Sequence, residues 1–366
     1  MLAVHRPIVG ASAGRYVLIM LVAFAITVVG TRLYLEATGY PQIGNETFHF
    51  AHALWGGLLL AVTALLLLVF VNRWFYTLSA VLAGVGAGLF VDEVGKFITQ
   101  QNDYFFPLAA SVIYVTFLLF LLVYLLARGR PSRNLRADMY EILHELEEVL
   151  EDDFSVSERA AMLERLDRVE NQTDRPDLAE LARHIRAFVN SGAVAVVADR
   201  ETLFSRFLAW YKKFEDRWLT QTFMRRVFVL IYIVSAFGSV VMLSVLYGLL
   251  TGDGALRQDL LRDIFSAPNV TGTTSATWYV VLIVLHTLCS VLVLAGVGAF
   301  LLKREALAVW LGIIVMIITV TYINTVSFYF NQFSVVLNSA YAFLVLVALQ
   351  RYRARFMKPG TAESAR

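Results

Sequence analysis

The chain has 366 residues, of which 58% are hydrophobic and 16% are charged, and its formal net charge at pH 7 is +2. A mean hydropathy of +0.65 places it well outside the range of soluble globular proteins. The nearly neutral charge leaves no electrostatic footprint for binding nucleic acid. The single cysteine, Cys289, excludes an intramolecular disulfide bond and leaves the redox compartment open.

Eight apolar stretches organise the sequence, and each has roughly the 20 residues that a helix needs to cross a bilayer. Because helices satisfy their own backbone polar groups in lipid, the sequence predicts an all-α polytopic protein with eight transmembrane helices. The first stretch is long and lacks a small-residue cleavage site, so we expect a retained anchor. The predicted spans cover residues 16–35, 49–71, 75–98, 104–127, 227–250, 277–301, 306–328 and 332–350.

Basic residues lie at every second connection between the predicted spans. Lysine and arginine mark the cytoplasmic side, so both termini and the central segment are predicted to be cytoplasmic. Only the 251–276 connection departs from this pattern, with Arg257 and Arg262 among aspartates. Compact loops and the lack of organellar signals favour a bacterial cytoplasmic membrane, where the Asn-x-Thr triplets at Asn45 and Asn269 are weak glycosylation signals. The basic residues that set the orientation are Arg6, Arg15, Arg73, Arg128, Arg130, Arg133, Arg136, Arg225, Arg226, Lys303, Arg304, Arg351, Arg353 and Arg355.

The two sets of four spans resemble each other. The third span turns polar near its outer end at Asp92 and Glu93, and the seventh does so at Asn324 and Thr325. Four spans per unit keep the orientation of a tandem copy, as in parallel-repeat transporters. The alternative is that Leu-, Val- and Ala-rich helices resemble one another by composition alone. The predicted domains are a first repeat at 1–130, a cytoplasmic helical domain at 131–222, a second repeat at 223–355 and a cytoplasmic tail at 356–366.

The predicted cytoplasmic domain reads as a small helical bundle. Ser155 and Glu158 make a capping box, and Asp174 before Pro176 is a candidate helix start. Such a bundle could couple the halves, mediate homo-oligomerisation or act as a sensor. Apolar residues at one-face spacing are Met139, Leu143, Leu146 and Leu150, then Leu178, Leu181, Ile185 and Phe188, and in a last amphipathic helix Phe204, Phe207, Tyr211, Phe214 and Trp218.

Polar groups gather in the outer half of the predicted bundle, where each ionisable side chain is costly. Gly84, Gly88 and Asp92 are four residues apart, so Asp92 shares a face where helices approach closely. Lys96 follows Asp92 by four residues, the favourable order for a local ion pair. Glu93 is rotated by about 100° and is expected to reach outward. The predicted binding residues are Asp92, His286, His52, Glu93, Lys96, Asn324 and Tyr322.

Three functions fit this arrangement. The first is transport or permeation of an ion, proton or small solute, with Asp92 and His286 facing an outward-open cavity. The second is a membrane-embedded metal-dependent enzyme or a haem- or metal-binding protein, in which His49, His52, Asp92 and His286 supply nitrogen and oxygen ligands for zinc or ferrous iron. The third is a scaffold whose polar residues are structural. Membrane lipids are expected partners, and no particular cofactor is indicated.

Overall fold

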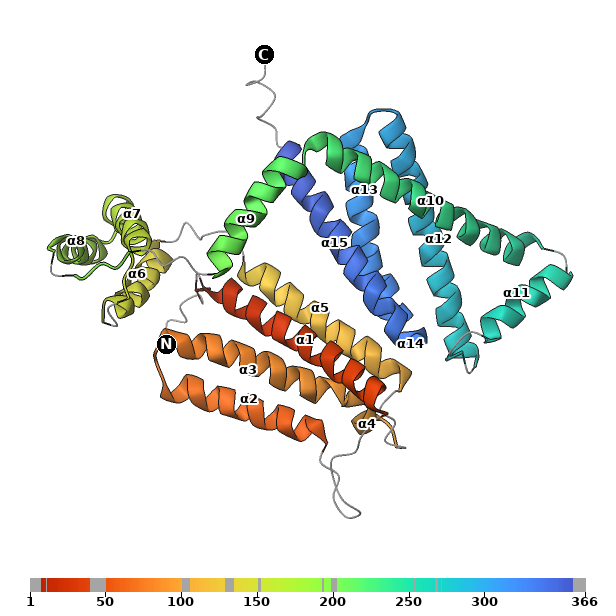
Figure 1. Cartoon of the computed structure of the whole chain (residues 1–366), viewed down its shortest axis with the longest axis horizontal. Coiled ribbons are helices and arrows are strands. Elements are labelled where there is room, and N and C mark those ends of the chain that lie inside the picture. Colours follow the sequence, from red (N-terminus) through yellow and green to blue (C-terminus); the bar gives the residue numbers. More distant parts are fainter. Residues whose placement is uncertain are drawn as a thin grey trace. The chain divides into compact units, whose positions relative to one another are not determined.

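The computed structural model is built from helices, eight of which are long and apolar enough to cross a membrane (Figure 1). Among the residues described there is no β-strand, only an isolated bridge between Ser155 and Val197. The number and order of the membrane-length helices agree with the sequence prediction, which fits a multi-pass integral membrane protein. The structure describes residues 8–10, 12–39, 51–100, 106–128, 135–150, 153–192, 194–198, 203–252, 254–266, 269–270 and 272–357.

The chain forms two compact units, and each unit is built from two separate stretches of the sequence. Unit 1 comprises Met1–Val91 and Leu119–Phe207, and unit 2 comprises Asp92–Leu118 and Leu208–Arg366. The first half of the fourth predicted span thus belongs to unit 2.

Glycines set the helix packing in unit 1, which contains α1 (Ala13–Thr38), α2 (His52–Val69) and α3 (Arg73–Asp92). A Cβ added at Gly88 would lie 2.9 Å from the Cβ of Thr27 on α1, and Gly84 approaches the same helix. On the other side of α3, a Cβ at Gly56 of α2 would lie 2.6 Å from the Gly86 carbonyl oxygen. Small residues thus let three helix backbones approach closely, as expected for helices in lipid.

Unit 1 also contains a three-helix bundle made of α6 (Leu135–Leu150), α7 (Val156–Gln172) and α8 (Pro176–Asn190). The capping box of Ser155 and Glu158 is confirmed. The predicted start at Asp174 is wrong by one residue, because Arg175 precedes the first helical residue. The core of the bundle consists of Met139, Ile142, Phe154, Met162, Leu166, Val169, Ala182, Ile185, Val189 and Val194.

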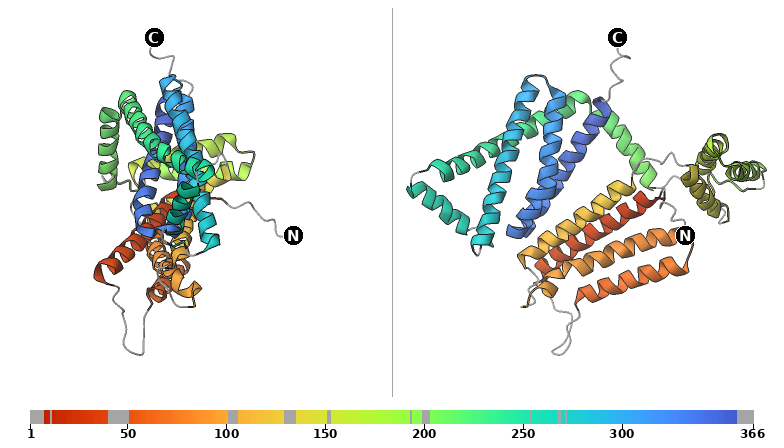
Figure 2. Two further views of the ribbon diagram at one scale, coloured as in Figure 1. Left: turned by 90° about the vertical axis from the view of Figure 1, so that its right-hand side faces the viewer. Right: turned by 180° about the vertical axis from the view of Figure 1, so that it is seen from behind.

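Unit 2 packs four membrane-length helices around Tyr232, which lies on α10 (Gln221–Thr251). The Tyr232 ring fits against two glycines, Gly296 and Gly312, and its hydroxyl donates to the Ala308 carbonyl at 2.6 Å. These partners lie on α12 (Thr273–Leu301) and α13 (Glu305–Ile318). Both views in Figure 2 show α13 beside α15 (Gln332–Phe356), with which it is in contact.

Two predicted spans are interrupted near the end that carries their polar residues. The third ends as α3 at Asp92, and a separate short helix, α4 (Val94–Ile98), follows Glu93. The seventh changes from α13 into a π-helical segment, η1 (Thr319–Ile323), and continues as α14 (Asn324–Phe330). π-helical turns are frequent at functional sites.

Three further helices complete the described fold, namely α5 (Pro107–Ala127), α9 (Leu203–Trp218) and α11 (Gly254–Ser266). The sequence analysis did not predict α11.

Candidate functional site

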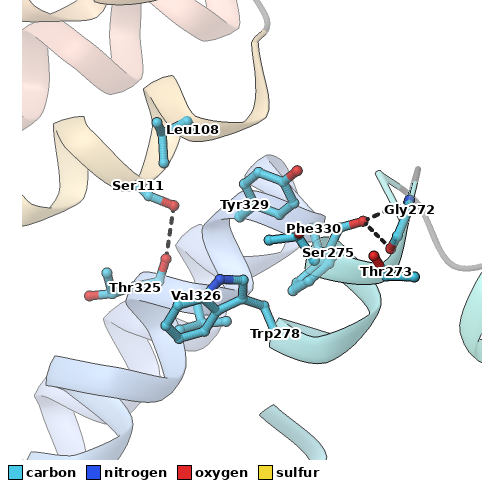
Figure 3. Close-up of a pocket in the computed structure, with 11 residues that line it drawn as sticks. Leu108, Ser111, Gly272, Thr273, Ser275, Trp278, Thr325, Val326, Tyr329 and Phe330 are labelled. Atoms are coloured by element: carbon cyan, nitrogen blue, oxygen red, sulfur yellow. Dashed lines mark hydrogen bonds between the residues drawn. The ribbon is translucent and has the colours of Figure 1, made fainter. Parts of the chain in front are cut away.

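A cavity of about 600 Å³ lies in unit 2, where the first turns of α5 and α12 meet the last turns of α14 (Figure 3). Hydroxyl groups and aromatic rings dominate its wall. The indole of Trp278 and the rings of Tyr329 and Phe330 supply the apolar surface. Its lining residues are Leu108, Ser111, Gly272, Thr273, Thr274, Ser275, Trp278, Thr325, Val326, Tyr329 and Phe330.

Hydrogen bonds hold the helix ends that form the cavity. The Ser111 hydroxyl on α5 donates to the Thr325 carbonyl at 2.9 Å, which ties α5 to α14 (Figure 3). The Ser275 hydroxyl accepts from the Gly272 N–H at 3.1 Å and closes the first turn of α12. Nearby, the Asn269 side chain donates to the Tyr329 carbonyl at 3.1 Å, so its amide caps α14. The capping role leaves little reason to regard Asn269 as a glycosylation site.

A buried polar network continues from the cavity toward the middle of the helices. The hydroxyl of Tyr114, one turn deeper than Ser111 on α5, donates to the Val320 carbonyl of η1 at 2.8 Å. Asn324 is fully buried; its amide nitrogen lies 3.5 Å from the Tyr114 hydroxyl, and its oxygen accepts from Asn338 at 3.1 Å. Tyr114 lies seven residues into α5, which is roughly 10 Å from the helix start at 1.5 Å per residue. The polar groups therefore extend from the cavity well into the membrane-length helices.

The cavity wall is mostly apolar with hydroxyl groups set into it, and no Asp, Glu, Lys, Arg or His is among its described lining residues. The first turn of α12 contributes backbone N–H groups, which make a helix N-terminus weakly positive. Hydroxyl groups can both donate and accept hydrogen bonds. The wall is thus suited to a small molecule that carries hydroxyl, amide or carbonyl groups beside apolar surface.

The three predicted charged residues near the end of α3 are brought together differently from the prediction. Asp92 and Glu93 are both fully buried, so the expectation that Glu93 points outward is wrong. The Lys96 ammonium lies 2.5 Å from a carboxylate oxygen of Glu93. The helix ends at Asp92 and restarts at Val94, so Asp92 and Lys96 do not lie on one continuous helix as the predicted spacing assumed.

The other predicted residues do not line the cavity. His286 is half-buried on α12, eight residues beyond Trp278, which places it roughly 12 Å deeper along the helix. Tyr322 is 66% exposed whereas Asn324 is buried, because positions two residues apart lie on nearly opposite sides of a helix. His52 begins α2 in unit 1.

The described part of the structure gives no support to the proposed metal site. His49 lies outside the described residues. Within the described part of the chain, no three His, Cys, Asp or Glu side chains are grouped closely enough to hold a metal ion.

The sequence analysis missed Ser111, Tyr114, Trp278 and Asn338, which form the cavity and the network below it. A usable signal existed for two of them, since Ser111 and Tyr114 are polar residues three apart within a largely apolar span. It also missed Arg32, a charged residue of α1 that is only 9% exposed and follows Phe24 and Val28 on the buried face. A charge inside a predicted span is itself the signal that should have singled out Arg32.

In the described part of the chain the fold is all-helical, and its eight membrane-length helices are compatible with a multi-pass integral membrane protein. The cavity lies at one end of these helices, with no charged side chain among its described lining residues. Comparison with models of known families, with curated proteins and with solved structures finds no match.

Proposed function

We propose that this protein carries a small, uncharged polar solute across a bacterial cytoplasmic membrane and that the hydroxyl-lined cavity is its outer binding site. One observation supports this most strongly. The polar lining does not stop at the cavity wall but continues through Ser111, Tyr114 and Asn324 into the membrane-length helices. Unpaired polar groups are costly in lipid, and a series of hydrogen-bonding groups that leads inward from a cavity is what a permeation pathway needs.

The described lining residues carry no charge, which favours an uncharged solute. A bare ion entering the cavity would lose its hydration without meeting an opposite charge, which is strongly unfavourable. A polyol or small amide could exchange its water hydrogen bonds for those of Ser111, Thr273 and Thr274, with its carbon skeleton against Trp278. The sequence analysis expected an ion, a proton or a small solute, and we propose the last of these, in the form of an uncharged polar molecule.

Asp92 and His286 complete the proposal as groups that couple the flux to a proton or cation. Asp92 is fully buried next to a helix break and His286 is half-buried in a membrane-length helix. Ionisable residues in such places mark proton or ion pathways, and broken helices are used by transporters to build ion sites.

Flux measurements on the full chain in proteoliposomes test the proposal, with glycerol and sorbitol as the probes and stopped-flow light scattering as the readout. Tyr114→Phe removes the hydroxyl that joins Val320 and Asn324, and we expect it to lower the flux roughly twofold to tenfold, the equivalent of one hydrogen bond lost from the rate-limiting state. Tyr124→Phe makes the same change further along α5 and should leave flux unchanged. Asp92→Asn should abolish accumulation while leaving expression intact.

Each arm has an outcome that contradicts its part of the proposal. If wild-type vesicles pass neither polyol faster than empty vesicles, the solute class is wrong. If Tyr114→Phe and Tyr124→Phe behave alike, the network is structural. Accumulation at the wild-type level in Asp92→Asn refutes the coupling role.

We also propose the four-plus-four repeat, with both termini and the segment 131–222 in the cytoplasm. The two helix interruptions support the repeat, because the break at Glu93 and the π-helical segment at Thr319–Ile323 occupy corresponding places in the third and seventh spans. Each interruption is next to a buried polar residue, Asp92 in one case and Asn324 in the other.

A further inference from the structure

Helix α9 leads almost directly into a membrane-length helix. It ends at Trp218, and only Leu219 and Thr220 separate it from α10, the fifth membrane-length helix. The Thr220 hydroxyl accepts from the Phe223 N–H at 3.3 Å, so the junction is a capped helix start rather than a long linker. Two residues span at most roughly 7 Å, so where α10 crosses a bilayer the last turns of α9 must lie close to its surface.

One face of α9 exposes a row of aromatic side chains, which we call the aromatic stripe. It consists of Trp210, Tyr211, Phe214 and Trp218, which are 58%, 39%, 40% and 59% exposed. At about 100° per residue, the other three positions lie within about 60° of Phe214 around the helix axis. Trp210 and Phe214 stack with their ring centroids 5.7 Å apart. So much aromatic surface on one side of a helix requires an apolar or interfacial partner.

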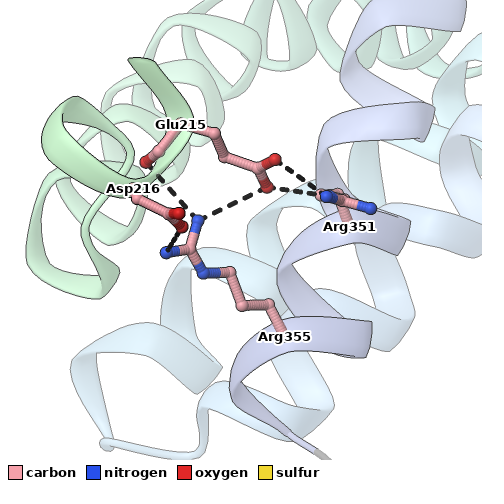
Figure 4. A network of polar contacts seen from close by, with 4 residues as sticks. All are labelled: Glu215, Asp216, Arg351 and Arg355. Carbon is pink, nitrogen blue, oxygen red and sulfur yellow. Dashed lines mark hydrogen bonds and ion pairs between the residues drawn. The ribbon is translucent and has the colours of Figure 1, made fainter. Parts of the chain in front are cut away.

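An ion-pair network around the buried carboxylate of Glu215 fixes which way the stripe faces (Figure 4). Glu215, on one flank of the stripe, is 3% exposed and accepts from Arg351 at 2.7 and 2.8 Å. Arg355 reaches the same carboxylate at 3.4 Å and pairs with Asp216 at 2.8 Å. Both arginines belong to the last turns of α15, the eighth membrane-length helix. Hydrogen bonds from Arg351 lower the pKa of Glu215, so this carboxylate stays ionised at neutral pH. The network holds one flank of α9 against α15, and among the described residues the rings of the stripe stay largely exposed.

The opposite flank of the stripe is basic. Lys213 and Arg217 are four residues apart and exposed, at about 100° and 60° from Phe214 on the side away from Glu215. Lys212, also exposed, lies on the far side of the helix, about 160° from Phe214. Lys213 and Arg217 thus border the same side of the aromatic stripe, where they can bind anionic groups that lie beside its rings.

We propose that α9 lies in the plane of the membrane interface, with the aromatic stripe at the boundary of headgroups and acyl chains and with Lys213 and Arg217 bound to the phosphates of anionic phospholipids. Aromatic rings with one apolar and one polar edge concentrate at this depth, and basic amphipathic helices lie there. The bilayer is the occupant because the stripe continues into the exposed apolar surface of α10, where Phe223 and Leu230 are 48% and 61% exposed. The charge of the flank matches anionic headgroups.

Spin-label accessibility on the full chain in vesicles of phosphatidylcholine and phosphatidylglycerol tests the position of the helix. Cys289→Ala removes the only cysteine, and a nitroxide is attached at Phe214→Cys or, as the matched control, at Lys212→Cys. We expect the label at 214 to be accessible to oxygen and shielded from a water-soluble nickel chelate, and the label at 212 to show the reverse. Access of the chelate to both sites places the stripe in water, and exclusion of both relaxing agents from 214 means that protein covers it. Either result overturns the proposal.

A second measurement tests the lipid. A bimane attached at Phe214→Cys is quenched by brominated phosphatidylglycerol or by brominated phosphatidylcholine in mixed vesicles, and the ratio of the two reports the local preference for anionic lipid. Each basic residue near a membrane surface contributes roughly fivefold to such a preference. Lys213→Gln/Arg217→Gln should therefore lose most of it, whereas Lys212→Gln should keep it. Equal quenching by both lipids in the parent protein, or an equal loss in the Lys212→Gln control, contradicts the assignment.

Discussion

Single tyrosines tie the helices of unit 2 together. Tyr114 and Tyr232 each donate a hydrogen bond to a backbone carbonyl of another helix, at 2.8 and 2.6 Å. Inter-helical hydrogen bonds in membranes average only about 0.6 kcal/mol, so neither bond dominates the stability of the fold. Their main effect is on register, because a sliding helix would leave a buried hydroxyl and a carbonyl without partners.

One residue of the helical bundle makes its stability depend on pH. Glu145 on α6 pairs with Arg165 through one carboxylate oxygen, while the other, Oε2, is buried with no hydrogen-bond partner in the described chain. Burial raises the pKa of Glu145 above 4.5, and the charge of Arg165 offsets this only in part. The folded state therefore holds the proton more tightly than the unfolded chain, and its stability falls as the pH rises through the raised pKa.

Glu145→Gln removes the titrating group and should abolish this pH dependence. We expect the wild-type bundle to have a lower free energy of opening at pH 7.5 than at pH 5, and the variant to show no such difference. Hydrogen exchange of the α6 and α7 amides in the full chain, corrected for intrinsic rates, measures both values. A variant that is weaker than wild type by the same amount at both pH values would show that the Arg165 ion pair outweighs the burial of the charge.

The site residues show what a sequence can and cannot reveal at this scale. Asp92 was found because a carboxylate inside an apolar span is costly wherever it points. The orientation of Glu93 was not predictable, because it depends on a helix break that leaves no clear mark in the sequence. Ser111 and Thr273 carry no such cost, since hydroxyls in a helix can bond to their own backbone, so their role becomes visible only when three helix ends meet.

Helix packing rests on the position of individual glycines. Gly56 and Gly57 are neighbours on α2, yet only Gly56 faces α3. A Cβ at Gly56 would lie 2.6 Å from the Phe90 nitrogen, whereas nothing lies within 4 Å of one at Gly57. Gly56→Ala should therefore destabilise the protein by about 1–3 kcal/mol through overpacking, and Gly57→Ala should be neutral or gain up to about 1 kcal/mol from helix propensity.

Unfolding of the full chain by SDS in mixed micelles, followed by circular dichroism, compares the two variants. Gly56→Ala is expected to unfold at a lower SDS fraction than Gly57→Ala. Equal midpoints would mean that α2 and α3 are not in close contact in the membrane.

Element type was predicted well and element faces less so. Apolar length alone was enough for the eight membrane-length helices, because the bilayer sets one strong requirement. On α6, however, Leu143 and Leu150 are 47% and 85% exposed although they were predicted to share the packed face. The buried face runs through Met139 and Ile142 instead. Leucines lie on two adjoining sides of this helix, and which side is packed depends on α7 and α8, which the local pattern does not specify.

At the scale of the whole molecule, the predicted orientation of the spans depends on how many basic residues each connection between them carries. The basic residues beside the predicted cytoplasmic ends outnumber those elsewhere, and Arg225 and Arg353 are further held there, by a 2.8 Å pair with Glu305 and by a 4.5 Å contact with the Trp310 ring. Arg257 and Arg262 oppose this orientation from α11. Aspartates do little to cancel basic charge in topology, so these two arginines are a real exception rather than a neutralised one.

Labelling with a membrane-impermeant maleimide in intact cells tests whether the topology follows the larger set of basic residues or Arg257 and Arg262. In a Cys289→Ala background, Ser266→Cys at the end of α11 should react from outside, and Ser157→Cys in the bundle should react only after the membrane is opened. Only α10 separates these positions among the membrane-length helices, so they must lie on opposite sides if α10 spans. The reverse pattern would show that Arg257 and Arg262 determine the topology. Reaction of both from one side would mean that α10 does not cross the bilayer, in which case α9 could not be held at its surface by that span.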